Sequence, residues 1–146
     1  MEYFIDKIIS RGGTIYLVGG INRDRLFNYY HNTNHVPRDY DILVLKLPCV
    51  DLINILSKFG KINEVGKSFG VLKFRDSLTD ILFDIALPRT EISTGPDHKD
   101  FEITVDQNIP LELDLTRRDS TMNSIAQNFF YFKKNLIAKI IAWKLK

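Results

Sequence analysis

The amino-acid sequence predicts an α/β (α+β) fold in which a mixed sheet is flanked by helices within a single domain. The chain has 146 residues and is 45% hydrophobic, which suits one compact core. Segments with apolar residues at helical spacing alternate with runs of β-forming residues, as expected when helices pack against a sheet. No repeat or low-complexity segment divides the chain.

Each element is predicted from a local pattern. Apolar residues three and four apart predict helices, and continuous or alternating runs of β-branched and aromatic residues predict strands. Glycine, proline and polar clusters mark the loops. The predicted elements are, in order, helix 3–10, strand 14–20, helix 21–30, loop 31–37, strand 38–47, helix 51–60, strands 68–76 and 80–89, loop 92–110, helix 111–127, a short aromatic stretch 129–132 and a basic, apolar helix 133–146.

Composition excludes several classes of protein. The net charge is only +2, so a wholly basic surface that coats nucleic acid is not expected. No segment approaches the roughly 18 apolar residues of a membrane span, so no membrane role is expected. The single cysteine, Cys49, cannot form an internal disulfide, which favours the cytoplasm. His31, His35 and His98 are too scattered for a zinc site and are interpreted as loop residues.

Asp39 and Asp41 lie near the start of the predicted strand 38–47. Residues two apart in a strand project to the same face, so the carboxylates repel unless they are solvated or bind a cation such as Mg²⁺. Taken alone, such a pair is more often a turn or a solvated strand edge. Asp84 lies in a run expected to be fully buried, where a lone charge is costly. It either joins the pair around the same ions or binds a buried arginine or a backbone amide.

Two further motifs suit phosphate binding. Gly19 and Gly20 separate a strand from a helix whose free amides favour an anion, and Arg23 lies in the first turn of that helix. A tight turn is the alternative. Arg117 and Arg118 are neighbours on a predicted helix and point about 100° apart, so at most one is expected to face a ligand. The alternative is an exposed salt-bridge cluster.

Six motifs stand in order along the chain: "LVGGINRD", "RDYDILV", "VGKSFGVLKF", "FDIALPRTE", "HKDFEITVD" and "LDLTRRDSTMNSIA". Together they resemble those of the head (catalytic) domain of the CCA-adding tRNA nucleotidyltransferase and bacterial poly(A) polymerase family. This family belongs to the DNA polymerase β-like nucleotidyltransferase superfamily. The resemblance runs from about Ile15 to Ala126.

The resemblance implies roles for individual residues. Asp39, Asp41 and Asp84 would be the catalytic carboxylates that bind metal, and nucleotide binding would fall to Gly19, Gly20, Arg23 and Arg118. Residues 66–69 would support the site, and Gly95 and His98 would lie in a loop beside it. The implied reaction uses two Mg²⁺ ions, about 3.5–4 Å apart, to move a nucleotide from an NTP (ATP or CTP, or both) to a hydroxyl with release of pyrophosphate.

The chain also departs from the family pattern. Asn22 and Ser120 replace apolar residues of the motifs, and 127–146 is expected to be a divergent C-terminal extension of a head domain spanning 1–146. The neck, body and tail domains of the family are expected to be absent. The extension is interpreted as a closing helix with its lysines in solvent. Alternatively, it steers a phosphate backbone or docks a partner protein that replaces the missing domains.

The leading functional hypothesis is a minimal, stand-alone nucleotidyltransferase that acts on an RNA (tRNA-like) 3′ end. One alternative is transfer of a nucleotide to a protein side chain or a small molecule. The other is a non-catalytic module that binds a nucleotide or a partner.

Overall fold

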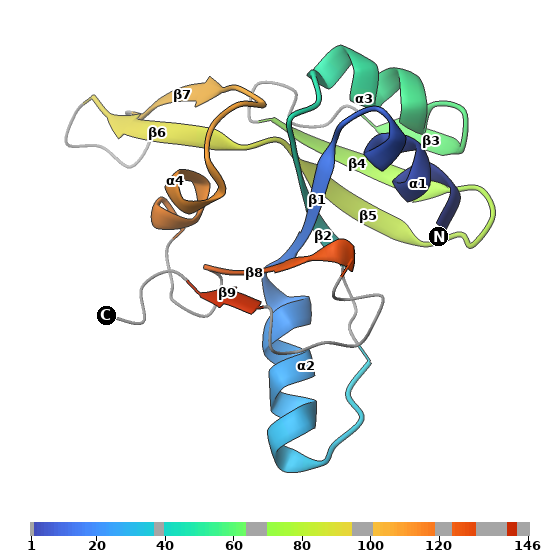
Figure 1. The fold of residues 1–146 in the computed structure, drawn as a ribbon, viewed down its shortest axis with the longest axis vertical. Helices are drawn as coiled ribbons and strands as arrows, with labels where there is room; N and C mark the ends of the chain where they lie inside the picture. Colours follow the sequence, from blue (N-terminus) through green and yellow to red (C-terminus); the bar gives the residue numbers. More distant parts are fainter. Residues whose placement is uncertain are drawn as a thin grey trace.

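The computed structural model describes residues 2–36, 40–63, 70–94, 101–118, 124–130 and 140–142 (Figure 1). The helices are α1 (Glu2–Ser10), α2 (Gly20–His31), α3 (Cys49–Leu56) and α4 (Leu111–Thr116). The strands are β1 (Thr14–Val18), β2 (Tyr40–Leu45), β3 (Gly60–Asn63), β4 (Val71–Asp76), β5 (Leu82–Ala86), β6 (Arg89–Ser93), β7 (Phe101–Val105), β8 (Ile125–Asn128) and β9 (Ile140–Ala142). Across these ranges, no helix has the length and apolar character of a membrane span.

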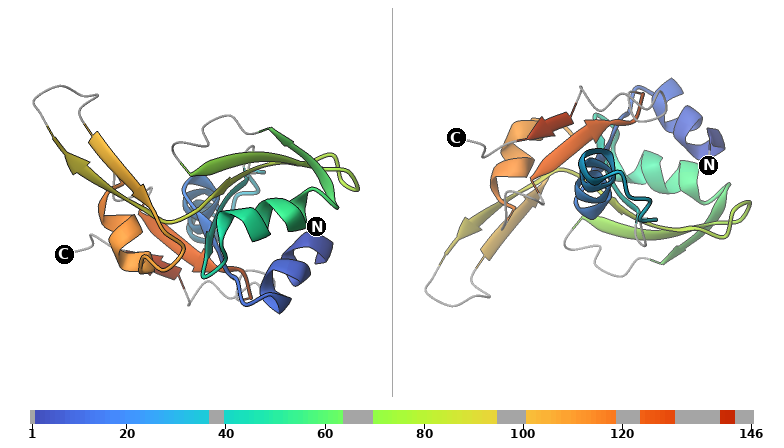
Figure 2. Two further views of the ribbon diagram at one scale, coloured as in Figure 1. Left: turned by 90° about the horizontal axis from the view of Figure 1, so that it is seen from above. Right: turned by 90° about the horizontal axis from the view of Figure 1, so that it is seen from below.

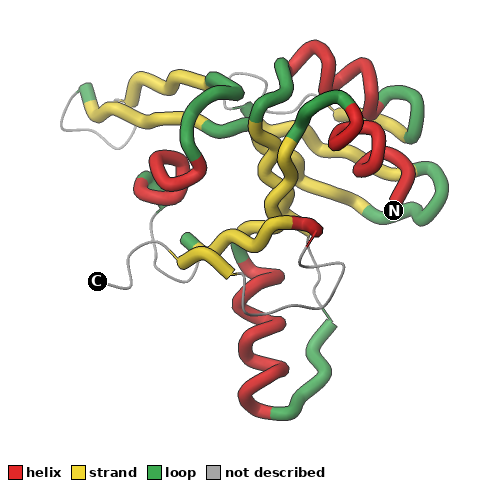
Figure 3. The backbone as a smooth tube through the Cα atoms, viewed as in Figure 1, coloured by secondary structure: helices red, strands yellow, loops and turns green. Residues whose placement is uncertain are grey.

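The main sheet is mixed, as predicted. Its strand order is β3-β4-β5-β2-β1-β8-β9. Strands β2 and β5 run parallel, and the other neighbouring pairs are antiparallel. Strands β6 and β7 form a separate two-stranded hairpin, which extends away from the main sheet in Figure 3. The predicted fold class, a mixed sheet flanked by helices, is confirmed.

Strand β2 lies in the centre of the sheet and is buried on both faces. Its side chains alternate between two apolar clusters, as the period of a strand requires. Ile42 and Val44 enter the larger cluster with α1 and α3, whereas Leu43 and Leu45 enter the smaller cluster with α4. Figure 2 shows α1 and α3 together on one side of the sheet. This packing fixes the position at which β2 begins.

Helix α2 projects from the end of β1, away from the sheet (Figure 1). Its first turn is anchored by Asn22, which is fully buried. Asn22 Nδ2 donates hydrogen bonds to the carbonyl oxygens of Leu17 at 2.7 Å and Ile125 at 3.1 Å. One turn later, Arg25 donates to Oε1 of the buried Gln127, and burial lowers the pKa of Arg25. The start of α2 is therefore fixed to both β1 and β8.

Two segments differ from their predicted structure. The loop predicted over 92–110 contains the end of β6 and all of β7, which pair from Arg89↔Val105 to Ser93↔Phe101. Of the helix predicted over 111–127, residues 111–116 form α4, but the prediction is wrong for residues 125–127, which belong to strand β8, and β8 pairs with β1. Pairing with a buried strand outweighs the helical spacing of these residues. Residues 119–123 lie outside the described residues.

Two other helix predictions also differ from the structure. The helix over 51–60 ends at Leu56, and Gly60 begins β3. A Cβ on Gly60 would overlap the carbonyl oxygen of Arg75, so the close pairing of β3 with β4 requires glycine. Of the helix predicted over 133–146, residues 140–142 form strand β9 beside β8. The rest of that prediction lies outside the described residues.

Asp76 closes the turn between β4 and β5. It is 3% exposed and accepts hydrogen bonds from the backbone N–H of Thr79 at 2.9 Å and from Thr79 Oγ1 at 2.6 Å. Burial acts to raise the pKa of Asp76, but the hydrogen bonds that it accepts, those from Thr79 foremost, act together with a positive charge to hold the pKa below its ordinary value of 3.8. The ionised carboxylate therefore stabilises the fold.

We expect Asp76→Ala to lower the free energy of unfolding by about 1–3 kcal/mol near neutral pH, because Thr79 loses its buried acceptor. Since the folded pKa is depressed, the charge-dependent part is complete above 3.8 and is lost as the pH falls through the folded value. Urea unfolding at about pH 7 and about pH 3 measures this change. The exposed Asp6→Ala should change stability by less than about 0.5 kcal/mol. An equal loss for Asp76→Ala at both pH values would contradict this account.

Candidate functional site

Asp41 lies where β1 ends and β2 begins. Antiparallel pairing places it opposite Val18, the last residue of β1, and parallel pairing places it beside Asp84 of β5. Residues paired directly across neighbouring strands project to the same face of a sheet, so the two carboxylates share one face. The two strands are neighbours, as predicted. Asp39 lies outside the described residues, and among those described no group of three metal-binding side chains is found.

Asp84 is half exposed and forms an ion pair. Its side chain is 37% exposed, and Lys73 Nζ lies 3.1 Å from Oδ1 and 3.2 Å from Oδ2. The expectation of full burial is wrong because β5 alternates: Phe83 and Ile85 are buried, whereas Asp84 projects to the other face. Its partner is a lysine of β4, not the arginine or amide considered from the sequence. An exposed pair of this kind contributes little stability, so the carboxylate remains available to a ligand.

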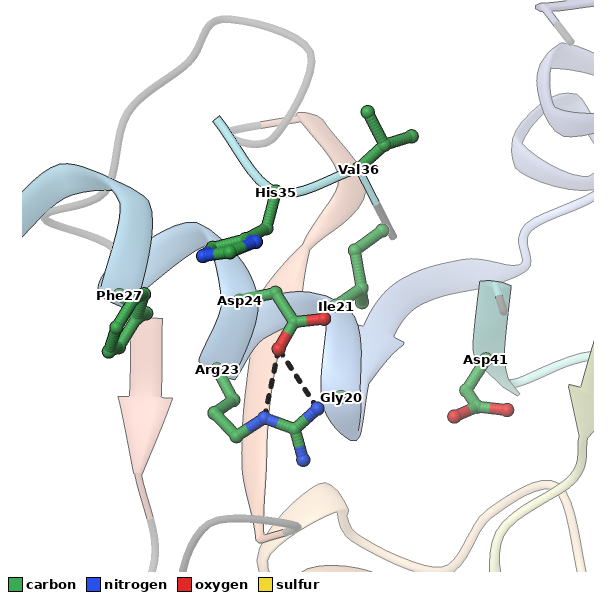
Figure 4. A pocket seen from close by; sticks show the side chains of 8 residues that line it. All are labelled: Gly20, Ile21, Arg23, Asp24, Phe27, His35, Val36 and Asp41. Atoms are coloured by element: carbon green, nitrogen blue, oxygen red, sulfur yellow. Dashed lines mark hydrogen bonds and ion pairs between the residues drawn. The ribbon is translucent and has the colours of Figure 1, made fainter. Parts of the chain in front are cut away.

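Gly19 joins β1 to α2 and packs against Asp41. Its φ of 71° is a left-handed conformation that favours glycine. A Cβ on Gly19 would lie 2.8 Å from Oδ2 of Asp41. Helix α2 starts at Gly20, so its free N–H groups and positive dipole end lie near this carboxylate. Arg23 folds back toward Gly20 and pairs with Asp24 at 2.9 Å (Figure 4).

We expect Gly19→Ala to strain the backbone and also to displace the Asp41 carboxylate. The left-handed conformation alone costs about 1–2 kcal/mol for a residue with a Cβ. Gly12→Ala is the matched control, because Gly12 has a φ of 89° but nothing within 4 Å of an added Cβ. Urea unfolding and Mn²⁺ titration of both variants separate the two effects. Only Gly19→Ala should weaken Mn²⁺ binding; equal weakening in Gly12→Ala would contradict a role for the contact with Asp41.

Asp114 of α4 accepts hydrogen bonds from three arginine residues. It is fully buried, and its Oδ1 accepts hydrogen bonds from the backbone N–H of Arg89 at 3.1 Å and from Arg117 Nη2 at 2.8 Å. Its Oδ2 accepts from Arg118 Nη2 at 3.1 Å. Glu91 of β6 adds ion pairs to Arg89 at 2.7 Å and to Arg117 at 3.2 Å. The two acidic side chains therefore fix the guanidinium groups in position.

Arg117 and Arg118 do not lie within a helix, because α4 ends at Thr116. The predicted separation of about 100° therefore does not apply, and both side chains bind Asp114. They are only 14% and 16% exposed. The alternative of an exposed salt-bridge cluster is wrong for both of these side chains.

Two hollows meet at Gly20 and Asp41, which line both of them. The larger, of about 600 Å³, runs along α2 and is shown in Figure 4. Its other lining residues are Ile21, Arg23, Asp24, Phe27, His35 and Val36. The smaller, of about 400 Å³, is lined also by Gly19, Arg89, Glu91, Arg117 and Arg118. The structure therefore brings the predicted Gly19, Gly20, Arg23, Asp41 and Arg118 to one place.

Asp114 is one of the residues of this site that sequence reasoning missed. Its spacing could have revealed it, because Asp114 precedes Arg118 by four residues and Arg117 by three. Arg89 and Glu91 stand in the motif "FDIALPRTE" but were given no role. The supporting segment 66–69, Gly95 and His98 lie outside the described residues.

Comparison with known proteins identifies the family. The family model described as the poly A polymerase head domain matches residues 15–140. A CCA-adding enzyme of Buchnera aphidicola subsp. Cinara cedri is 38% identical over 135 residues, which covers 87% of this chain and 29% of that protein. A multifunctional CCA protein of Nitrosococcus oceani is 37% identical over 113 residues, or 77% of this chain and 24% of that protein. The chain thus spans 24–29% of the length of these relatives.

Solved structures show the same fold. An apo form of a CCA-adding enzyme superposes with a TM-score of 0.65 at 25% identity, over 86% of this chain and 26% of that one. The Bacillus stearothermophilus CCA-adding enzyme in complex with CTP gives a TM-score of 0.62 at 24% identity, over 95% of this chain and 28% of that one. The chain belongs to the head domain family of the poly(A) polymerases and CCA-adding enzymes.

Proposed function

We propose that this chain is a nucleotidyltransferase that moves a nucleotide from ATP or CTP to the hydroxyl of an RNA (tRNA-like) 3′ end and releases pyrophosphate. The proposal rests on the position of Asp41, which packs against Gly19, lies beside Asp84 and lines both hollows. The names of the relatives, CCA-adding enzyme and multifunctional CCA protein, support this class of reaction. So does the CTP complex of the Bacillus stearothermophilus enzyme.

The carboxylates fit divalent metal ions. Asp41 and Asp84 offer hard oxygen ligands on one face of the sheet, the kind that Mg²⁺ prefers. We assign Asp39, Asp41 and Asp84 to hold two Mg²⁺ ions. When bound, the ions would activate the acceptor hydroxyl and offset the charge of the departing pyrophosphate. Lys73 already offsets the charge of Asp84, which limits repulsion between the carboxylates in the free protein.

The nucleotide is assigned to Gly19, Gly20, Arg23 and Arg118. The first amides of α2 donate to phosphate oxygens. Arg118 is held by Asp114, so little side-chain freedom is lost when it contacts a ligand. Arg23 exchanges Asp24 for a phosphate oxygen, and this exchange costs little because both side chains of the pair are partly exposed. These residues orient the nucleotide beside Asp41.

Incubation of the purified protein with Mg²⁺, each labelled NTP in turn and a pool of RNAs, including tRNA without its 3′ end, tests the proposal. We expect a lengthened, labelled RNA and release of pyrophosphate. Label on protein or on a small molecule would instead identify another acceptor for the same chemistry. No transfer from any NTP to any of these acceptors would contradict the proposal.

A non-catalytic nucleotide-binding module is the second candidate, and the Lys73–Asp84 ion pair favours it. In this case the ammonium group of Lys73, 3.1 Å from Asp84, takes the place of a metal ion. NTP binding would then not depend on Mg²⁺. Titration of an NTP with and without Mg²⁺ distinguishes this module from the enzyme, for which Mg²⁺ is required.

A further inference from the structure

An aromatic wall, formed by Phe27 and His35, lines the larger hollow. In Figure 4, Phe27 lies on the opposite side of Arg23 and Asp24 from Asp41, and His35 lies above Asp24. Phe27 is 46% exposed, and its ring centroid lies 5.6 Å from that of His35. An aromatic ring exposed in a hollow offers a face on which a flat ligand can stack.

Asn28 holds the aromatic wall in place. Helix α2 ends at His31, and the next residue, Asn32, has a left-handed φ of 50° that turns the chain back. Asn28 Oδ1 accepts hydrogen bonds from Thr33 Oγ1 and from the backbone N–H of His35, and Asn28 Nδ2 donates to the carbonyl oxygen of His35, each at 2.9 Å. The His35 ring is therefore positioned beside Phe27 before any ligand binds.

The two hollows differ in charge. Arg89, Arg117 and Arg118 line the smaller one. Among the described residues that line the larger one, Arg23 is the one basic group besides His35, and Asp24 already pairs with it. Phosphate groups are therefore better bound in the smaller hollow and at Gly20, which both hollows share and beside which the Arg23 guanidinium group lies. The larger hollow suits a flat group with little charge.

We propose that the aromatic wall stacks on a nucleobase, which comes either from the incoming NTP or from the terminal residue of the acceptor RNA. The inference rests on the proposed function and adds a base contact within this chain. Both ligands combine a phosphate chain with a flat base, which matches the two hollows. At about 600 Å³, the larger hollow lies within the usual size of small-molecule sites.

Calorimetric titration of Phe27→Ala and Phe27→Leu tests this proposal. The ligands are ATP, inorganic tripolyphosphate and two short single-stranded RNAs, one ending in adenosine and one ending in an abasic residue, all with Mg²⁺. We expect both variants to weaken binding of ATP or of the adenosine-ended RNA by about 5- to 150-fold, the usual effect of a lost stacking ring. Binding of tripolyphosphate and of the abasic RNA should stay unchanged. A loss for ATP identifies the incoming base, and a loss for the RNA alone identifies the acceptor base.

Tyr30→Ala is the matched control. Tyr30 is an aromatic residue of the same helix, is 75% exposed and does not line the hollow, so this variant should bind all four ligands normally. Unchanged binding in both Phe27 variants, an equal loss for tripolyphosphate, or a wild type that binds neither base-bearing ligand would overturn the proposal. If only the proposed function is wrong, no nucleotide is transferred, but the Phe27 variants still bind the base-bearing ligands more weakly than the wild type does.

Discussion

Asp41→Asn is expected to lower the rate of nucleotide transfer by about 10³-fold or more, if the bound metal ions supply several kcal/mol of transition-state stabilisation. The asparagine keeps the size of the side chain and its place against Gly19 but loses the charge that would hold Mg²⁺. The fold should remain, because repulsion between neighbouring carboxylates is reduced. Single-turnover incorporation of labelled nucleotide, with saturating Mg²⁺ and NTP, measures the loss.

Asp51→Asn provides the comparison for Asp41→Asn. Asp51 is an exposed carboxylate of α3 and lines neither of the two hollows that meet at Asp41. Its replacement should leave the rate within about twofold of the wild type, since surface changes away from a site have small effects. Circular dichroism and urea unfolding verify that both variants are folded. A folded Asp41→Asn variant within tenfold of wild-type activity would remove Asp41 from the metal site.

Asp114→Ala is expected to cost about 3–5 kcal/mol of stability, because removal of one partner leaves charged groups buried without their counter-charge. Arg117 and Arg118 lose their shared carboxylate, and the backbone N–H of Arg89 loses its acceptor. Urea unfolding of the wild type, Asp114→Ala and Asp114→Asn measures the loss. The asparagine side chain keeps an acceptor oxygen and the volume of aspartate. Asp114→Asn should therefore lose less stability than Asp114→Ala, and it should fold even if the alanine variant does not.

Glu112→Ala is the control within α4. Glu112 is exposed, so its loss should change stability by less than about 0.5 kcal/mol. A loss below about 1 kcal/mol for Asp114→Ala would show that the buried carboxylate is not what holds the arginines. Asp114→Asn should also weaken binding of tripolyphosphate, since Arg118 is no longer oriented by a charge. This second measurement separates an effect on the site from an effect on the fold alone.

Much of the site could be predicted because its residues lie where one secondary-structure pattern of the sequence ends and another begins. The glycine pair follows a continuous apolar strand, and Asp41 begins another, so the sequence itself marks the junction of strand and helix. The expected burial of Asp84 between Phe83 and Ile85 predicts that it lies beside Asp41; the neighbouring position is correct, but Asp84 projects to the other face of β5 and its side chain is 37% exposed. The amphipathic spacing of residues 3–10 likewise predicted a helix there.

The rest depends on contacts between distant parts of the chain. The residues of β8 continue the apolar spacing of a helix, yet they form a strand. In this strand Gln127 is buried and pairs with Leu17, 110 residues earlier. Asn22 was interpreted as a minor departure from a family motif. In the structure the Asn22 side chain connects β1 to β8, because it donates hydrogen bonds to the carbonyl oxygens of Leu17 and of Ile125, 103 residues away. The local spacing of Asp114 suits its pairs with Arg117 and Arg118, but its hydrogen bond from the backbone N–H of Arg89 joins residues 25 positions apart. No local spacing encodes these three contacts.

The most direct test of a metal site at Asp41 and Asp84 is a crystal structure of the protein with Mn²⁺ and a non-hydrolysable NTP, in which anomalous scattering locates each ion. We expect peaks within about 2.0–2.3 Å of carboxylate oxygens of both residues, with the phosphates directed toward Arg118 and the start of α2. Lys73 should then have moved away from Asp84. A nucleotide bound without Mn²⁺ at these carboxylates, with Lys73 still paired to Asp84, would contradict the account.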